Sequence, residues 1–454
     1  MSALLLGIDV GTSACKTAVL DETGAERAHG QAPMPWERVP HGAEIEPDAL
    51  FDTALAAARA ALAGAPQGRV CGVGVTSMGE AGVLLDDRGR PLAPVIAWHD
   101  SRGEEEARRI ESDLGEQRFV EHTGLPASPL CSLAKLGWLV EHRPATRAGV
   151  RWLNVAEWVV RRLGGRDVAE LSLASRTGLL DLPTRTPFEE ALAWAGLPGD
   201  LCGELVLAGT PAGTVDGAVL PDAAGAALTV AGHDHLCAGV GVGVVQPGDV
   251  LDSCGTAEAL VRVVAPPLDG EQVRRSVAGG VTVGWHVAED RQALLGAVWS
   301  GLALQEVLDA LEVGEDGRGE LDAGALATPA GDAAALDLNL NLHSVDRRPP
   351  PLPAGAPPER IWRGAIDVVA MEVEAVLAQI EAVAGPRRKV VVTGGWARDE
   401  AVLASKERLG AVETPPVVEA GARGAALLGG VAGGVFESVD SLPPIPIPAT
   451  AGRS

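Results

Sequence analysis

The chain has 454 residues, and its hydrophobic content of 46% is enough for a large buried core. Its formal net charge of −24 argues against a nucleic-acid partner and against binding to an anionic membrane surface. Apolar runs stay well short of the roughly 20 residues of a membrane-spanning helix, and the six cysteines show no CxxC spacing. We therefore expect a cytoplasmic protein of two or three domains with free thiols, which begins with a strand rather than a signal peptide.

The first predicted element is a strand–turn–strand over residues 4–20, which reads LLLGIDVGTSACKTAVL. Its tip and the start of its second strand carry Asp9, Gly11, Thr12, Ser13 and Lys16. Backbone N–H groups and hydroxyls on such a tip suit phosphate oxygens. An ordinary hairpin with glycine in its turn shows the same pattern, and Lys16 could point toward a phosphate or toward solvent.

A helix is predicted over Asp48–Ala63, followed by a buried strand over Val70–Val75. That strand ends in a polar loop, at the position where open α/β sheets bind ligands. The loop residues that we expect to contact a small molecule are Ser77, Met78, Gly79 and Glu80.

A short strand, Pro94–Trp98, leads into Trp98, Asp100 and Arg102. On an extended segment these alternate residues share one face. The Trp98 ring offers an apolar plate, Asp100 accepts hydrogen bonds and Arg102 donates several of them. Together these groups suit a polyhydroxylated molecule. The same residues also fit a tryptophan that closes the edge of the core beside an Asp–Arg ion pair.

The rest of the first half is read mainly as helical. Helices are predicted over Glu104–Leu114, Ser132–His142 and Trp152–Leu163, and the alternating segment Leu171–Leu182 could line the rim of a site. A strand at Leu228–Ala231 then meets the turn Gly232–His235, before a small-residue helix predicted over Leu236–Val245. Asp234 on this turn either projects its carboxylate into a cleft or caps the helix.

A second strand–turn–strand, Asp249–Val264, repeats the first device. Asp252 stands in it where Asp9 stands in the first, and Gly255 and Thr256 form its tip. The chain therefore looks duplicated. Two such tips that face each other could clamp a polyphosphate.

Predicted elements of the remaining chain are a helix over Leu294–Leu311, a surface loop over Gly314–Asp332, a proline-rich irregular segment over Asp346–Pro358, a helix over Ile361–Ala384, strands at Lys389–Thr393 and Val417–Val418, a helix over Ala401–Leu409, a helix over Ala422–Gly430 and a loosely held tail over Leu442–Ala449. Gly394 and Gly395, with Gly421 and Arg423 nearby, suggest a flat surface for an adenine ring. A pair of glycines after a strand is also common in a plain tight turn.

As a set, these motifs resemble the FGGY carbohydrate kinases over nearly the whole chain. Asp9–Ser13 is similar to the first phosphate motif of that family, Gly255–Thr256 to the second, and Gly394–Gly395 with Gly421–Ala426 to the adenosine motif. The segment Ser132–His142 is similar to the N-terminal signature, except at the preceding Leu130, and Asp234 matches the catalytic aspartate. The loop 77–80 and His235 depart from the usual residues, which leaves the sugar open.

The resemblance implies an α/β protein with the two-domain actin-like (ribonuclease H-like) ATPase fold, in which duplicated β-sheet domains flank a cleft. Residues 1–244 would bind the sugar and the first phosphate tip, and residues 245–454 would bind the nucleotide. The implied reaction transfers the γ-phosphate of ATP, with Mg²⁺ held by Asp9, to a hydroxyl of a small ketose or polyol. Asp234 would be the general base, and His235 would join the substrate contacts.

Two other functions are compatible with parts of the sequence. An actin-like ATPase acting on a protein partner would share both tips, but it would need neither the Trp98–Arg102 segment nor Asp234. A nicotinamide dehydrogenase reading of Gly239, Gly241 and Gly243 fails, because these glycines lie inside a predicted helix without the acidic residue that should follow. The oligomeric state stays open, with a homodimer as one option.

Overall fold

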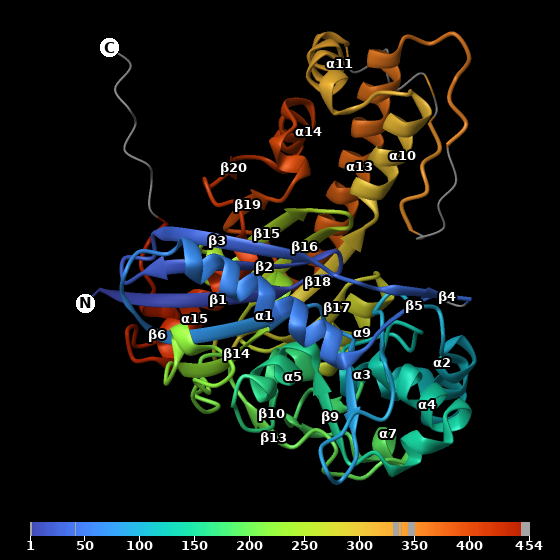
Figure 1. Ribbon diagram of the computed structural model, residues 1–454. Coiled ribbons are helices and arrows are strands. Elements are labelled where there is room, and N and C mark those ends of the chain that lie inside the picture. The colour runs from blue at the N-terminus through green and yellow to red at the C-terminus, as the bar shows by residue number, and fades with distance from the viewer. Residues whose placement is uncertain (1, 41, 330–335, 337, 344–349, 446–454) are drawn as a thin grey trace.

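The computed structural model describes residues 2–40, 42–329, 336, 338–343 and 350–445. Two β-sheets form its centre (Figure 1). The first has the order β14-β6-β1-β2-β3, with β1 (Ala3–Val10), β2 (Ala14–Asp21), β3 (Glu26–Pro33), β6 (Arg69–Ser77) and β14 (Ala227–His233). The second has the order β17-β18-β16-β15-β19-β20, with β15 (Asp249–Cys254), β16 (Glu258–Val264), β17 (Thr282–Trp285), β18 (Gln292–Val298), β19 (Lys389–Thr393) and β20 (Val412–Glu413).

The two sheets share a five-strand topology, to which β17 adds a sixth strand at one edge of the second sheet. In each, the predicted strand–turn–strand forms an antiparallel pair, β1–β2 or β15–β16, and a third antiparallel strand adds to the second member. Parallel strands then add to the first member, β6 and β14 in one sheet and β19 and β20 in the other. The duplication predicted from the two tips is confirmed.

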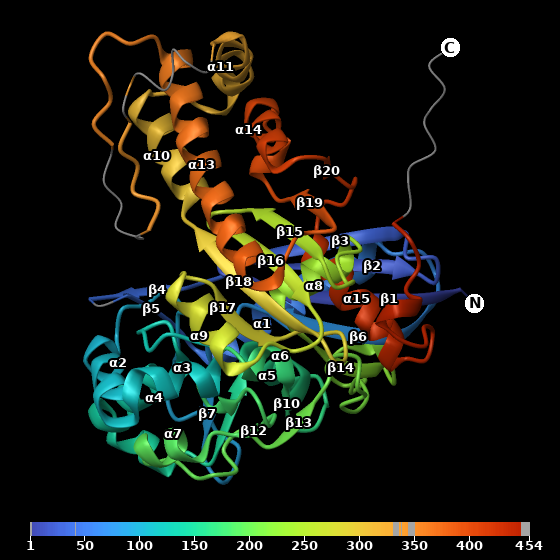
Figure 2. The same ribbon diagram turned by 180° about the vertical axis from the view of Figure 1, so that it is seen from behind.

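Helices cover both faces of the first sheet. Helix α1 (Pro47–Gly64) packs on β2 and β3, and α5 (Val155–Arg162) packs on β6 and β14. The helices α8 (Asp234–Gly241) and α15 (Ala420–Ala432) pack together, and α15 lies against β1 and β6 (Figure 2). The last α-helix of the described residues therefore returns to the first sheet, while the division at residue 244 stays a prediction.

Glycines explain how closely α15 approaches its neighbours. A Cβ atom on Gly74 of β6 would lie 1.9 Å from the carbonyl oxygen of Ala425, and one on Gly424 would lie 1.8 Å from that of Cys237. Because no side chain fits into these contacts, the alternating glycines of β6 and the small residues of α15 allow a helix to lie directly on the sheet.

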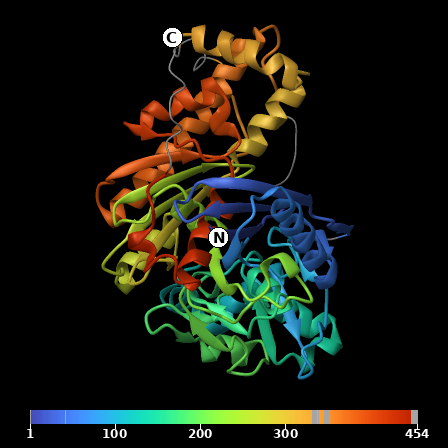
Figure 3. The same ribbon diagram turned by 60° about the vertical axis from the view of Figure 1, so that its left-hand side comes forward.

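The remaining helices gather at opposite ends of the molecule (Figure 3). One end holds α10 (Ser300–Ala310), α11 (Glu315–Ala327) and α13 (Pro358–Ala384), with α14 (Glu400–Ser405) packed on α11 and α13. The other end holds α2 (Glu104–Ile110), α4 (Ser132–His142) and α7 (Glu189–Trp194). The short elements near the latter end include α3 (Glu116–Thr123), α6 (Leu171–Ala174), α9 (Gly270–Ala278), β5 (Gly42–Ile45), β8 (Val95–Ile96) and β9 (Arg151–Asn154). Within the described residues, we find no helix with the length and apolar character needed to cross a bilayer.

Several element predictions are wrong. Strand β18 precedes α10 where one helix over Leu294–Leu311 was expected, because an apolar run fits a buried strand and a buried helix equally well. The loop predicted over Gly314–Asp332 contains α11, and residues 330–332 lie outside the described part. Strand β9 occupies the start of the helix predicted over Trp152–Leu163, and no strand forms at the described residues Val417–Val418.

Candidate active site

The carboxyl ends of three parallel strands meet at one edge of the first sheet. Asp9 of β1 is paired in register with Thr76 of β6, and Thr76 is paired with Gly232 of β14. The Thr76 hydroxyl donates to the Gly232 carbonyl oxygen at 2.6 Å, which closes the β6–β14 contact at this edge. Since ligands of open α/β sheets bind beyond the carboxyl ends of the strands, Asp9 and Asp234 are well placed to form a site.

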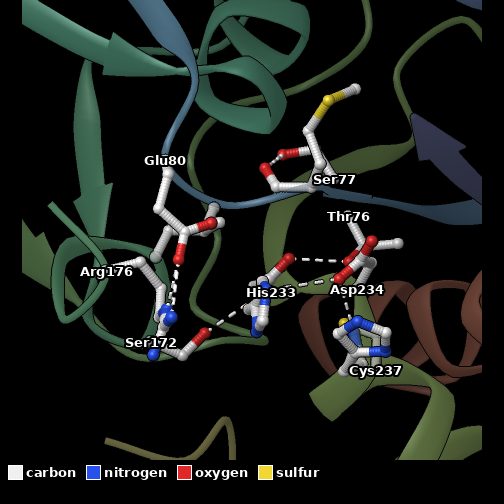
Figure 4. A network of polar contacts seen from close by, with 12 residues as sticks. Thr76, Ser77, Glu80, Ser172, Arg176, His233, Asp234 and Cys237 are labelled. Atoms are coloured by element: carbon white, nitrogen blue, oxygen red, sulfur yellow. Dashed lines mark hydrogen bonds and ion pairs between the residues drawn. The ribbon is translucent and has the colours of Figure 1, made fainter. Parts of the chain in front are cut away.

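Asp234 is the first residue of α8, two residues earlier than the predicted start of that helix. Its Oδ1 accepts a hydrogen bond from the backbone N–H of His235 at 2.7 Å and lies 3.3 Å from His233 Nε2 (Figure 4). A quarter of its side chain is exposed. The backbone N–H of His233 donates to the Ser172 hydroxyl at 3.0 Å, which fixes the chain just before the carboxylate.

Two carboxyl groups in this region hold protons unusually tightly. Burial raises the pKa of Asp9 to about 8, with a further contribution from the charge of Asp234. Burial also raises the pKa of Asp234 to about 7, and the charge of Glu80 adds to this. The pKa of His235 falls to about 4 because burial disfavours the imidazolium, so the ring is neutral at pH 7. Such a site favours a proton or a cation.

Asp9 fits a magnesium ion. Its Oδ1 is buried without a hydrogen-bond partner among the described residues, and carboxylate oxygen is a preferred ligand of Mg²⁺. A Cβ atom on Gly421 would lie 2.3 Å from Asp9 Oδ2, so this glycine lets α15 pass beside the carboxylate. Lys16 Nζ lies 2.9 Å from Glu419 Oε2, in a partly exposed ion pair that joins β2 to the approach of α15.

A series of contacts joins the two glycine tips. The indole N–H of Trp36 donates to the Thr12 carbonyl at 2.6 Å, and that of Trp98 donates to the Thr12 hydroxyl at 2.8 Å. The Trp98 ring stacks on Trp299, with centroids 5.7 Å apart and planes 4° from parallel. Trp299 directly precedes α10, where a Cβ atom on Gly301 would lie 2.0 Å from the Gly255 carbonyl oxygen. Among the tip residues, Ser13 and Thr256 are exposed, and Gly11 is partly buried.

The predicted adenine surface is only partly supported. Gly394, with φ of 103°, would place a Cβ atom 2.3 Å from the Cys254 carbonyl oxygen, so it packs beside the second tip. The space beside Gly395 is open, since no described atom lies within 4 Å of the corresponding Cβ position. Arg423 is a correction, because it is buried and its guanidinium donates to the carbonyls of Gly241, at 2.8 Å, and Gly24.

Arg176 was not among the site residues expected from the sequence. Its Nε and Nη2 lie 2.7 and 2.6 Å from Glu80 Oε1, and its Nη1 donates to the Thr282 hydroxyl at 2.8 Å. It therefore ties the loop after β6 to β17 of the second sheet, and Figure 4 shows it beside Glu80. Glu80 has a φ of 58°, and a Cβ atom on Gly79 would lie 3.2 Å from Arg176 and His233. The only sequence signal was the polar alternation of Leu171–Leu182.

Several predicted substrate contacts are buried or have hydrogen-bond partners within the protein. Ser77 and Met78 are buried, and the Ser77 hydroxyl accepts from the Ala156 backbone N–H at 3.1 Å. Asp100 is buried and accepts from the Arg102 Nε at 2.9 Å and Nη2 at 2.6 Å. Trp98 lies in a turn, so the extended shared face does not form, and the alternative of an Asp–Arg ion pair is confirmed.

A buried ion cluster supports the second tip. Lys406 Nζ lies 3.0 Å from Asp252 Oδ2 and also contacts Glu258, whose other oxygen accepts from the Ser300 hydroxyl at 2.8 Å. Burial and the charge of Asp252 raise the pKa of Glu258 to about 7. Because Asp252 has an ammonium beside it and Asp9 Oδ1 has no hydrogen-bond partner among the described residues, the two duplicated aspartates are not equivalent.

Two sheets with a shared five-strand topology, each with a glycine tip, form the two-domain actin-like ATPase fold. The family model for the N-terminal domain of the FGGY family of carbohydrate kinases matches residues 4–241, and the chain belongs to this family. It is 24% identical over 468 residues to a gluconokinase of Bacillus subtilis, covering 97% of this chain and 90% of that one.

Solved structures of the same fold cover almost the whole chain. The xylulose kinase of Rhodospirillum rubrum superimposes with a TM-score of 0.84 at 23% identity, covering 97% of this chain and 92% of that one. The glycerol kinase of Plasmodium falciparum with ADP superimposes with a TM-score of 0.82 at 17% identity, covering 98% and 93%. The predicted fold is confirmed, and the chain is a carbohydrate or polyol kinase.

Proposed function

We propose that the protein transfers the γ-phosphate of MgATP to a hydroxyl of a small ketose or polyol, with Asp234 as the general base. The observation that carries this proposal is the Asp234 carboxyl, whose pKa is raised to about 7 at the edge where three strands end. A base with a pKa near the working pH removes a proton most effectively. The xylulose kinase and glycerol kinase relatives support a ketose or polyol as the acceptor, and the gluconokinase relative is the reason to test aldonates as well.

Residues of both halves of the chain contact the reactants. In residues 1–244, Asp234 accepts the proton of the acceptor hydroxyl, while Glu80, held by Arg176, and the neutral His235 contact the remaining hydroxyls. The tip residues Gly11, Thr12 and Ser13 in this half, and Gly255 and Thr256 in residues 245–454, bind phosphate oxygens through N–H and hydroxyl groups. Gly394 and Gly395 border the nucleoside.

Asp9 would hold the magnesium ion through its unpartnered Oδ1. The ion, when bound, supplies positive charge that neutralises the transferring phosphate. The carboxylates of Asp9 and Asp234 act on different partners, one on the metal and one on the acceptor, so their mutual repulsion is relieved when both ligands are present.

The first experiment is a screen for acceptor-dependent ADP release across ketopentoses, aldoses, tetruloses, aldonates, polyols and glycerol. We expect one ketose or polyol of roughly three to seven carbons to raise ADP release well above the rate in buffer. If no compound raises ADP release, the proposed acceptor is wrong, and an actin-like ATPase with a protein partner, which would also use two phosphate tips, becomes the alternative to test.

We expect a pH profile with an acid limb. Below about pH 7 the Asp234 carboxyl is protonated and cannot accept the hydroxyl proton. The kcat/KM for the acceptor should therefore fall about tenfold per pH unit below pH 7 and level off above it. A value that stays flat between about pH 5 and pH 7 would show that another group is the base.

A further inference from the structure

Trp98 controls the direction of one hydroxyl at the first phosphate tip. Its indole N–H donates to Thr12 Oγ1, with 2.8 Å between the two atoms. An indole N–H can only donate, so the direction of this hydrogen bond is fixed. A hydroxyl has one proton and two lone pairs, so Thr12 keeps its own proton for a different acceptor.

Trp98 is itself held in place by a buried lysine. Lys135 of α4 is 2% exposed, and its Nζ donates to the carbonyls of Trp98, Pro129 and Leu130 at 2.8, 2.8 and 3.1 Å. These three bonds use all three protons of the ammonium group. Its direct hydrogen-bond partners are therefore three backbone carbonyls, with no carboxylate in an ion pair with Lys135 within the described part of the chain.

The opposite side of Trp98 meets the second half of the chain. Its ring stacks on Trp299, which leads directly into α10 beside the Gly255 tip. Trp98 therefore contacts the first tip through its N–H and the support of the second tip through its ring face. A residue that only binds sugar needs neither contact.

We propose that Trp98, seated by Lys135, is a positioning residue for phosphoryl transfer that acts through the Thr12 hydroxyl. Because Thr12 Oγ1 accepts from the indole N–H, the Thr12 hydroxyl can donate its own proton to a phosphate oxygen. Donors that are fixed in place in this way stabilise the charge of the transition state. This inference rests on the proposed kinase function. This role at the phosphate tip is separate from the sugar contact expected from the sequence.

The central test is a double-mutant cycle between Trp98→Phe and Thr12→Val. Trp98→Phe keeps a ring that can stack on Trp299 and removes the N–H, while Thr12→Val removes the hydroxyl at similar volume. We expect each change to lower acceptor-dependent kcat about tenfold with the acceptor KM unchanged, and the double variant to be no slower than Thr12→Val. A raised acceptor KM in Trp98→Phe, or additive losses of kcat, would overturn the proposal.

Trp194→Phe is the matched control, because it removes an exposed indole N–H that donates to Asp113 Oδ2 at 3.0 Å. Its kcat should equal that of the wild type. Lys135→Met should lower kcat as Trp98→Phe does, without further loss in the Trp98→Phe background, and it should shift the tryptophan emission spectrum as the Trp98–Trp299 stack loosens. An unshifted spectrum together with normal kcat in folded Lys135→Met would show that Lys135 does not position Trp98.

Two experimental outcomes distinguish a failure of this proposal from a failure of the proposed kinase function. A wild-type protein without acceptor-dependent ADP release would refute the proposed function before any variant is made. A working wild type with an additive cycle would refute the positioning role alone. Should Lys135→Met fail to fold, the Trp98–Thr12 cycle decides, with the melting temperature of Trp98→Phe expected to match that of Trp194→Phe.

Discussion

Asp234→Asn should lower acceptor-dependent kcat by about 10²- to 10⁴-fold, the usual loss when a general base is removed. Asparagine keeps the oxygen that accepts from the His235 backbone N–H, so the start of α8 should be preserved. It cannot take a proton from the acceptor hydroxyl. The melting temperature and the affinity for ATP should therefore change little, and the defect should lie in turnover.

The control is Asp222→Asn, which makes the same chemical change at an exposed position and should leave kcat as it is. The acid limb of the pH profile should also disappear from the residual activity of Asp234→Asn. Retention of more than about a tenth of wild-type turnover would mean that Asp234 is not the base, since that loss is over 1 kcal/mol smaller than predicted.

The second large effect concerns stability. Lys406→Met should lower the free energy of unfolding by about 3–5 kcal/mol, because it leaves Asp252 and Glu258 buried without their cation. Denaturant unfolding measures this directly. The Gly255 tip should weaken with the cluster, since Glu258 also holds Ser300 at the start of α10.

Two further variants test the cause of that loss. Lys389→Met removes a lysine from a more exposed pair, 3.4 Å from Glu413, and should cost at most about 1 kcal/mol. Adding Asp252→Asn and Glu258→Gln to Lys406→Met removes the uncompensated charges and should restore part of the stability. If the triple variant is no more stable than Lys406→Met, the effect comes from lost packing around the lysine stem.

Sequence reasoning worked where local pattern determines structure. The Asp-x-Gly-Thr tip and its repeat around Gly255 predicted the duplicated sheets. In the structure, Asp9 and Asp234, the aspartate after β14, lie at one edge of the first sheet. A strand that ends in glycine and a polar residue indicates, within a few consecutive positions, where the sheet edge that binds ligands lies.

Side-chain directions that depend on packing were not predicted from the sequence. Ser77 at the end of β6 and Met78 after it are buried, while Glu80 two residues further on meets Arg176, and no spacing rule predicts this difference. Arg176 and Lys406 meet their carboxylate partners only through the tertiary fold, from positions far along the chain. The bond from Trp98 to Thr12 was not predicted, because it joins residues that are distant in sequence.

The most direct measurement of the central claim follows the γ-phosphate by phosphorus NMR, with ATP and the best acceptor of the screen. Our account predicts one phosphate monoester of the acceptor for each ADP formed, with little inorganic phosphate, because a kinase must exclude water from the transfer. Release of inorganic phosphate in step with ADP, with no acceptor ester, would contradict it.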